Sequence, residues 1–133
     1  MPSLSSVNKI SMSLGLATVC LLGSAQAMAA DSCSNPQTQA DMNQCASQDY
    51  KNEDTRLNQT YKTLRGHLTT KEKSQLKTVQ LAWISYRDKS CEFTTRNSVG
   101  GSIHSLEKNS CLSQMTAVRR GELEQEIELL KSR

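Results

Sequence analysis

The sequence predicts an all-α fold: a three-helix domain with a long antiparallel helical hairpin, stapled by two disulfides. Apolar residues recur at steps of three and four over three long stretches, which is the spacing of one face of a helix. No β-rich run of useful length interrupts them. Four cysteines remain after the expected leader, and an even number is typical of disulfides in a small exported domain.

Residues 1–27 are predicted to be a signal peptide, which leaves residues 28–133 as the domain. A mainly apolar run from Ile10 to Gly23 precedes Ala25-Gln26-Ala27, whose small residues suit a signal peptidase, and cleavage after Ala29 is an alternative. The run is short for a membrane span and is diluted by hydroxyl residues. We therefore expect a periplasmic or secreted protein with no stable span after cleavage.

The charge and the reactive side chains exclude several classes of protein. Without the leader, 15 basic and 13 acidic residues leave a net charge of +2, which is too balanced to indicate nucleic-acid binding. No Cys-x-x-Cys pair is present and the two histidines are far apart, so no metal or other cofactor is expected. No Ser-His-Asp arrangement can be located, and we do not expect an enzyme.

The first helix is predicted from about Thr38 to Leu68. Thr38 with Asp41 three residues later resembles a capping box, and Asn35-Pro36 is an alternative start. One carboxylate, Asp54, lies in an otherwise mostly apolar seam. The seam consists of Met42, Ala46, Tyr50, Asp54, Leu57, Tyr61, Leu64 and Leu68.

The second helix is predicted from about Lys71 to Thr95. Thr69 and Glu72 form another capping box, so a tight turn near residue 69 should make the first two helices antiparallel neighbours. Because aromatic side chains bury the most area, the core is expected around Trp83 and Tyr86. The predicted inner face comprises Leu76, Val79, Trp83, Tyr86, Ser90 and Phe93.

The segment Arg96–Asn109 has no helical period and contains Gly100-Gly101-Ser102, so it is predicted to be a loop. The last helix is expected to start near Ser110. Its predicted inner stripe is Leu112, Met115, Arg119, Leu123, Ile127 and Leu130.

The positions of the cysteines favour two disulfides, Cys33–Cys45 and Cys91–Cys111. Cys33 precedes the first helix and could fold back to Cys45, while Cys91 and Cys111 flank the predicted loop. The pairing Cys45–Cys91 with Cys33–Cys111 stays open, since both helices of the hairpin extend similar lengths from the turn. Each disulfide would add about 3 kcal/mol by restricting the unfolded chain.

Five motifs follow one another across nearly the whole chain after the leader. They are Asp41-Met42-Asn43-Gln44-Cys45-Ala46, Asp54-x-x-Leu57-Asn58-x-x-Tyr61, Leu76-x-x-x-Gln80-x-x-Trp83-x-x-Tyr86-Arg87-Asp88-x-x-Cys91, Gly100-Gly101-Ser102, and Cys111-Leu112-x-x-Met115-Thr116-x-x-Arg119. Together they resemble the LprI-like lysozyme-inhibitor family of small exported bacterial proteins. The resemblance implies an all-helical exported domain that inhibits lysozyme.

A set of polar residues on or beside the inner faces is predicted to form a structural polar core. Asp54 and Arg87 should lie at similar heights in the hairpin and pair, because buried charges require partners. A binding site for an anion or a sugar is the alternative. Asn58 and Gln80 are expected to be interior hydrogen-bond partners, and Arg119 is a second inner cation that Asp54 could pair with.

The Arg96–Asn109 loop is the predicted site for binding a partner, because binding residues often lie on loops held by a rigid scaffold. Its donors could engage the paired carboxylates of a glycosidase cleft. The alternative is that the glycines only turn the chain. We expect binding and inhibition of lysozyme-type peptidoglycan hydrolases; the alternative is a periplasmic interaction, stress or toxin-immunity protein with a different partner. The candidate binding residues are Arg96, Gly100, Gly101, Ser102 and His104.

Overall fold

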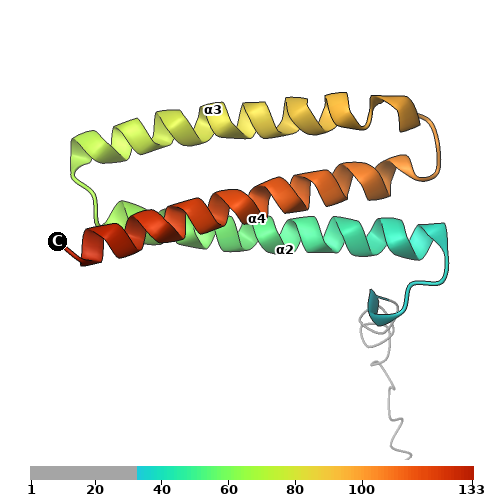
Figure 1. Cartoon of the computed structure of the whole chain (residues 1–133), viewed down its shortest axis with the longest axis horizontal. Coiled ribbons are helices and arrows are strands. Elements are labelled where there is room, and N and C mark those ends of the chain that lie inside the picture. Colours follow the sequence, from blue (N-terminus) through green and yellow to red (C-terminus); the bar gives the residue numbers. More distant parts are fainter. Residues whose placement is uncertain (1–32) are drawn as a thin grey trace, which may run out of the picture.

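The computed structural model describes residues 33–133, which form an elongated bundle of three long helices (Figure 1). In chain order these are α2 (Gln39–Gly66), α3 (Thr70–Thr94) and α4 (His104–Lys131), with a short 3-10 helix, η1 (Arg96–Ser98), between the last two. Helices α2 and α4 run in the same direction and α3 runs opposite to both. No strand occurs within the described residues, so the predicted all-α class is confirmed. The predicted signal peptide lies outside residues 33–133, and within that range no helix is long and apolar enough to cross a bilayer.

Capping boxes set the starts of α2 and α3, as the sequence predicts. The Thr38 hydroxyl accepts from the Asp41 N–H at 3.1 Å, and the Asp41 carboxylate accepts from the Thr38 N–H at 3.1 Å. Thr69 and Glu72 exchange the same two bonds at 3.4 and 2.8 Å. Each box satisfies backbone donors that would otherwise lack a partner at the first turn. The turn between α2 and α3 therefore lies where it is predicted.

The apolar core lies mainly between α2 and α4. Its buried centre consists of Leu57 and Leu64 from α2 with Leu123 and Ile127 from α4. The predicted stripes of these two helices are confirmed, because every member is buried or half-buried. Helix α4 packs most closely against α2, while α3 lies further from α2 than the hairpin connection alone suggests.

The predicted inner face of α3 is wrong at three of its six positions, whereas Leu76 and Trp83 pack against the core and Ser90 is half-buried. Tyr86 is 63% exposed, Phe93 is 66% exposed and Val79 is 53% exposed. Two aromatic residues, Trp83 and Tyr86, were expected at the centre of the core. Of these, only Trp83 packs against the core, and its side chain is partly buried.

The stripe of α3 that faces the bundle is more polar than predicted. It contains Gln80, Arg87 and Cys91, which are all buried. Cys91 is bonded to Cys111 of α4, and this disulfide holds the stripe of α3 that contains Cys91 against α4. Periodicity identifies a helix but does not distinguish two stripes that lie about 100° apart on its surface.

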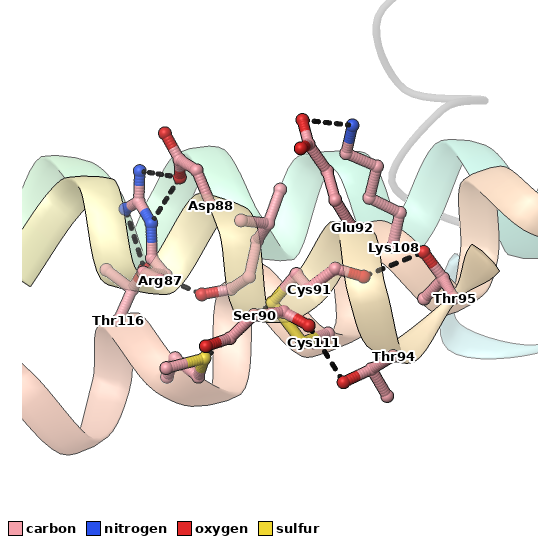
Figure 2. Close-up of a disulfide and its surroundings, with 12 residues drawn as sticks. Arg87, Asp88, Ser90, Cys91, Glu92, Thr94, Thr95, Lys108, Cys111 and Thr116 are labelled. Carbon is pink, nitrogen blue, oxygen red and sulfur yellow. Dashed lines mark hydrogen bonds and ion pairs between the residues drawn. A yellow bond between two sulfur atoms is a disulfide. The ribbon is translucent and has the colours of Figure 1, made fainter.

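Both disulfides form the favoured pairs. Cys33–Cys45 joins the segment before α2 to the second turn of that helix, with a Cα–Cα distance of 5.5 Å. Cys91–Cys111 joins α3 to α4 with a Cα–Cα distance of 5.7 Å, and Cys91 is fully buried (Figure 2). The open alternative, with Cys45 bonded to Cys91, is therefore excluded.

The predicted loop is shorter than expected and the last helix begins earlier. Residues predicted as loop form η1 and the first turns of α4, which starts at His104 rather than near Ser110. No side chain of the preceding residue caps this helix, since its N-cap is Ile103. The sequence therefore lacks the local signal that marks the other two helix starts.

Candidate binding surface

The connection from α3 to α4 is closed at its base by the Cys91–Cys111 disulfide. The buried Thr95 hydroxyl donates to the Cys91 carbonyl oxygen at 2.8 Å and ends α3 just beyond that disulfide (Figure 2). Lys108 of α4 lies 3.9 Å from Glu92 of α3 and spans the same two helices. The loop therefore leaves and re-enters the bundle from fixed positions.

Short backbone hydrogen bonds fold the connection into successive tight turns. The N–H groups of Ser98, Gly101 and His104 donate to the carbonyl oxygens of Thr95, Ser98 and Gly101, at 3.1, 2.9 and 3.2 Å. Gly100 has φ +82°, a conformation that L side chains rarely adopt. A Cβ on Gly101 would lie 3.1 Å from the Ser98 carbonyl oxygen. The two glycines are thus required by the shape of the loop.

Asn43 of α2 holds the loop and the start of α4 from across the bundle. Its Nδ2 donates to the Ser102 carbonyl oxygen at 2.9 Å, and its Oδ1 accepts from the Leu106 N–H at 3.1 Å. Leu106 is the third residue of α4, so its N–H has no partner within the helix. Asn43 therefore supplies the cap that Ile103 cannot. Asn43 belongs to the first of the five sequence motifs, but nothing in that motif indicates this contact.

The structure places four of the five candidate binding residues on this connection and the fifth, His104, at the first position of α4. Arg96 is exposed; its Nη1 donates to the Phe93 carbonyl oxygen at 2.7 Å, and its guanidinium lies 4.1 Å from the centre of the Phe93 ring. His104 is half-buried, with Nδ1 3.1 Å from the Ser98 hydroxyl. Ser102 and the two glycines are exposed. His104 thus supports the loop, whereas Arg96 and Ser102 are presented to solvent.

Exposed apolar side chains on this connection and at the end of α3 were not predicted as binding residues. Phe93, Val99 and Ile103 are 66%, 69% and 43% exposed. The only available signal was that Val99 and Ile103 lie in a segment without helical period, where apolar residues have no inner face to occupy. We call Phe93, Arg96, Val99, Ser102 and Ile103 the loop-end surface. It combines an aromatic ring, a guanidinium and aliphatic groups.

A hollow of about 880 Å³ opens beside the base of the loop. Its walls come from three segments: Pro36 and Met42 at the start of α2, Thr94 at the end of α3, and Leu106 in α4. Cysteines of both disulfides also line it. A partner that packs on the loop end therefore has an adjoining concave surface available.

The LprI family model, described as lysozyme inhibitor LprI, matches residues 17–123. The chain belongs to this family. An uncharacterized protein of Rhizobium meliloti (strain 1021) is 33% identical over 109 residues, which cover 72% of this chain and 78% of that protein. No solved structure matches the chain. The LprI assignment and the two disulfides fit an exported protein, and the LprI family comprises inhibitors rather than enzymes.

The longest LprI-like motif places a buried arginine at the centre of the bundle. Arg87 is 5% exposed and lies 3.5 Å from Asp54 of α2 and 2.9 Å from Asp88 of its own helix (Figure 2 shows the latter). Its Nη1 also donates to the buried Thr116 hydroxyl of α4 at 3.1 Å. The guanidinium lies 5.2 Å from the Trp83 ring centre. Arg87 therefore contacts all three helices and serves as their common polar centre.

The other predicted members of the polar core lie around Arg87 in two separate groups. Gln80 is buried and accepts from Arg119 Nε at 3.1 Å; Arg119 also pairs with Glu122 at 2.7 Å and makes no ion pair with Asp54. Asn58 is exposed rather than interior, and it donates to Asp54 Oδ2 at 3.1 Å from the solvent side. The expectation of an interior Asn58 is therefore wrong.

Burial changes the ionisation of one residue beside this arginine. The pKa of Tyr50 is raised, mainly because burial disfavours the phenolate, and the nearby Arg87 charge opposes that effect. The Tyr50 ring centre lies 5.3 Å from the guanidinium. No three His, Cys, Asp or Glu side chains in residues 33–133 are placed to hold a metal ion.

Proposed function

We propose that this LprI-family protein is exported after removal of residues 1–27 and that it binds and inhibits lysozyme-type peptidoglycan hydrolases. Membership of the LprI family carries the proposal for the class of partner. The loop-end surface is our proposed contact region, with Ser102 at its polar edge. His104 would support the loop through its hydrogen bond with Ser98.

Rigidity supports this choice of surface. The loop is tied by Cys91–Cys111, by its own turn hydrogen bonds and by Asn43. Binding through such a loop loses less conformational entropy than binding through a mobile one.

The chemistry of the exposed side chains also supports it. Aromatic residues and arginine dominate binding energy at interfaces, particularly where the contact excludes water. Phe93 with Arg96 over its ring offers both in one place. Val99 and Ile103 would extend the apolar contact. The Ser102 hydroxyl would donate or accept a hydrogen bond at the edge of that contact.

A lysis assay tests the proposal directly. Turbidity of a peptidoglycan suspension is followed with lysozymes of different types, each with and without the purified protein. The wild type should slow lysis by at least one of them. Failure against every type would contradict the proposed function and would favour a different periplasmic partner.

Two matched single variants test the surface. Phe93→Ala should weaken inhibition about tenfold, because a well-packed aromatic contact is worth more than 1 kcal/mol. Tyr86→Ala is the control: Tyr86 lies on the same helix and is 63% exposed, close to the 66% of Phe93. It should inhibit like the wild type. Equal effects of the two variants would rule out the loop end as the specific contact.

A further inference from the structure

The tip of the α2–α3 hairpin, which is the turn with the helical ends on either side of it, is the most basic segment of the described chain. Residues 62–77 contain five basic residues and one acidic residue, a formal charge of +4. The rest of residues 33–133 contains ten basic and eleven acidic residues. The net positive charge of the described residues therefore comes from this hairpin tip. We call Lys62, Lys71, Lys73 and Lys77 the turn lysines.

The turn lysines differ from most other basic residues because they form no ion pairs. In the described chain, pairs are formed by Arg56, Arg87, Lys108, Arg119, Arg120 and Lys131. Lys62, Lys71 and Lys77 are exposed, and Lys73 is half-buried. The one carboxylate of the segment, Glu72, is occupied by the Thr69 N–H at 2.8 Å and the Thr69 hydroxyl at 2.7 Å. The positive charge is thus available to an external partner.

The position of the turn lysines favours a broad partner over a small ligand. They lie on two helices at the tip of the hairpin, at the end of the elongated bundle opposite the loop end (Figure 1). The hollow of about 660 Å³ beside the tip is lined by Leu64, Glu72 and Leu76, by Glu122 and Glu126 of α4 and Arg133 beyond its end, and by none of the turn lysines. Lysine ammonium groups on flexible stems suit diffuse negative charge rather than one oriented anion.

We propose that the turn lysines form an electrostatic contact site for the phosphate headgroups of an anionic lipid membrane. A tip of unpaired lysines fits a flat anionic surface, whereas an extended polyanion would need a basic groove along the helices. Contact through the tip would stand the bundle end-on and point the loop end away from the lipid. Such attraction decays over about 8 Å at physiological ionic strength, so the contribution of each lysine would fall with its distance from the tip.

Vesicle binding of the exported protein tests this proposal without any hydrolase, so its outcome is independent of the proposed inhibition. The probes are phosphatidylcholine vesicles and vesicles with about one third phosphatidylglycerol. The triple variant Lys62→Gln, Lys71→Gln and Lys77→Gln removes three turn lysines. The control variant Lys51→Gln, Lys89→Gln and Arg96→Gln removes the same charge from three exposed cations that lie away from the tip and form no ion pair in the described chain.

The wild type should bind the anionic vesicles, and binding should weaken when salt is raised from about 50 to about 300 mM. Each cation close to such a surface contributes about fivefold, so the turn variant should lose at least about tenfold and at most about 100-fold in affinity. The control should lose less than about threefold. Circular dichroism melts should show that both variants remain folded.

Four results would overturn the proposal. They are no binding of the wild type to anionic vesicles, equal binding to pure phosphatidylcholine, equal losses in the two triple variants, and binding to soluble polyphosphate in place of vesicles. Equal losses in the two triple variants would show that binding depends on net charge and not on the tip. Binding to polyphosphate in place of vesicles would show that the partner of the tip is a soluble polyanion.

Discussion

Asn43 on α2 donates its side-chain amide to the carbonyl oxygen of Ser102, 59 residues further along the chain, at 2.9 Å. The same side chain accepts the Leu106 N–H, so one residue joins the middle of the loop to the first turn of α4. The shape of the loop-end surface thus depends on a helix that contributes no residue to it.

Replacing Asn43 should loosen the loop more than it destabilises the bundle. Asn43→Ala removes two hydrogen bonds that are not fully buried, so the free energy of unfolding should fall by only about 1 kcal/mol. Amide hydrogen exchange at residues 99–106 should accelerate, and inhibition should weaken with it. Asn58→Ala, an exposed change on the same helix, should leave that exchange unaltered. Unchanged exchange in Asn43→Ala would contradict the role assigned to this contact.

The two disulfides should contribute differently to function. Removing either pair by double substitution to Ala should lower the free energy of unfolding by about 3 kcal/mol, since the closed segments have similar lengths. Only loss of Cys91–Cys111 should also weaken inhibition strongly, because that bond closes the base of the loop. Denaturant unfolding and the lysis assay measure the two effects separately. A stronger functional loss from Cys33 and Cys45 would instead place the contact near the start of α2.

Asp54→Ala should be milder than the removal of a fully buried partner. The Asp54 side chain is 43% exposed, and without it Arg87 keeps Asp88 and the Thr116 hydroxyl. We expect a cost of about 0.5–1 kcal/mol in the free energy of unfolding.

Arg87→Met should cost more, about 2–4 kcal/mol, since it removes a buried group that contacts all three helices. Thermal or denaturant unfolding of both variants checks the order. If Asp54→Ala melted like the wild type but lost inhibition, Asp54 would belong to a binding site rather than to the polar core.

Acid should destabilise the helix starts. The pKa of Asp41 is lowered mainly by hydrogen bonding to the Thr38 side chain, and that of Glu72 mainly by the Thr69 backbone N–H. A carboxylate with a lowered pKa in the folded state contributes stability above its unfolded pKa, about 4, and loses it as the pH falls through the folded value.

The variant Asp41→Asn with Glu72→Gln should therefore lose less stability than the wild type between pH 5 and pH 2, about the range in which these carboxylates titrate. Melting temperatures across that range provide the measurement. The control, Asp49→Asn with Glu126→Gln, changes two exposed carboxylates and should keep the wild-type acid dependence. Parallel acid curves for all three proteins would show that the capping boxes do not carry this effect.

The local sequence determined where α2 and α3 begin, because each start carries a capping box. Thr38 with Asp41 and Thr69 with Glu72 are three residues apart, and each pair satisfies its bonds within one turn of the chain. The stripes of α2 and α4 were equally predictable, since each helix has one continuous apolar seam. The favoured disulfides follow from the same local order, because each joins cysteines close in sequence.

Only the tertiary structure decided which side of α3 is buried. Tyr86 and Arg87 are consecutive in α3 and point about 100° apart, and the large area that an aromatic ring can bury favoured Tyr86 as the inner residue. Arg87 is buried instead because Asp54, Asp88 and Thr116 together supply its partners, and two of these come from other helices. A single helix carries no information about such partners.

The start of α4 and the loop-end surface depend on the same kind of long-range contact. Ile103 offers no capping side chain, so the sequence around it did not mark a helix start; Asn43 from α2 satisfies the Leu106 N–H. Phe93 belongs to a periodic stripe, yet it is exposed because the Cys91–Cys111 bond turns a neighbouring stripe inward. The local sequence determined which segments are helical, and contacts between helices decided which of their side chains face a partner.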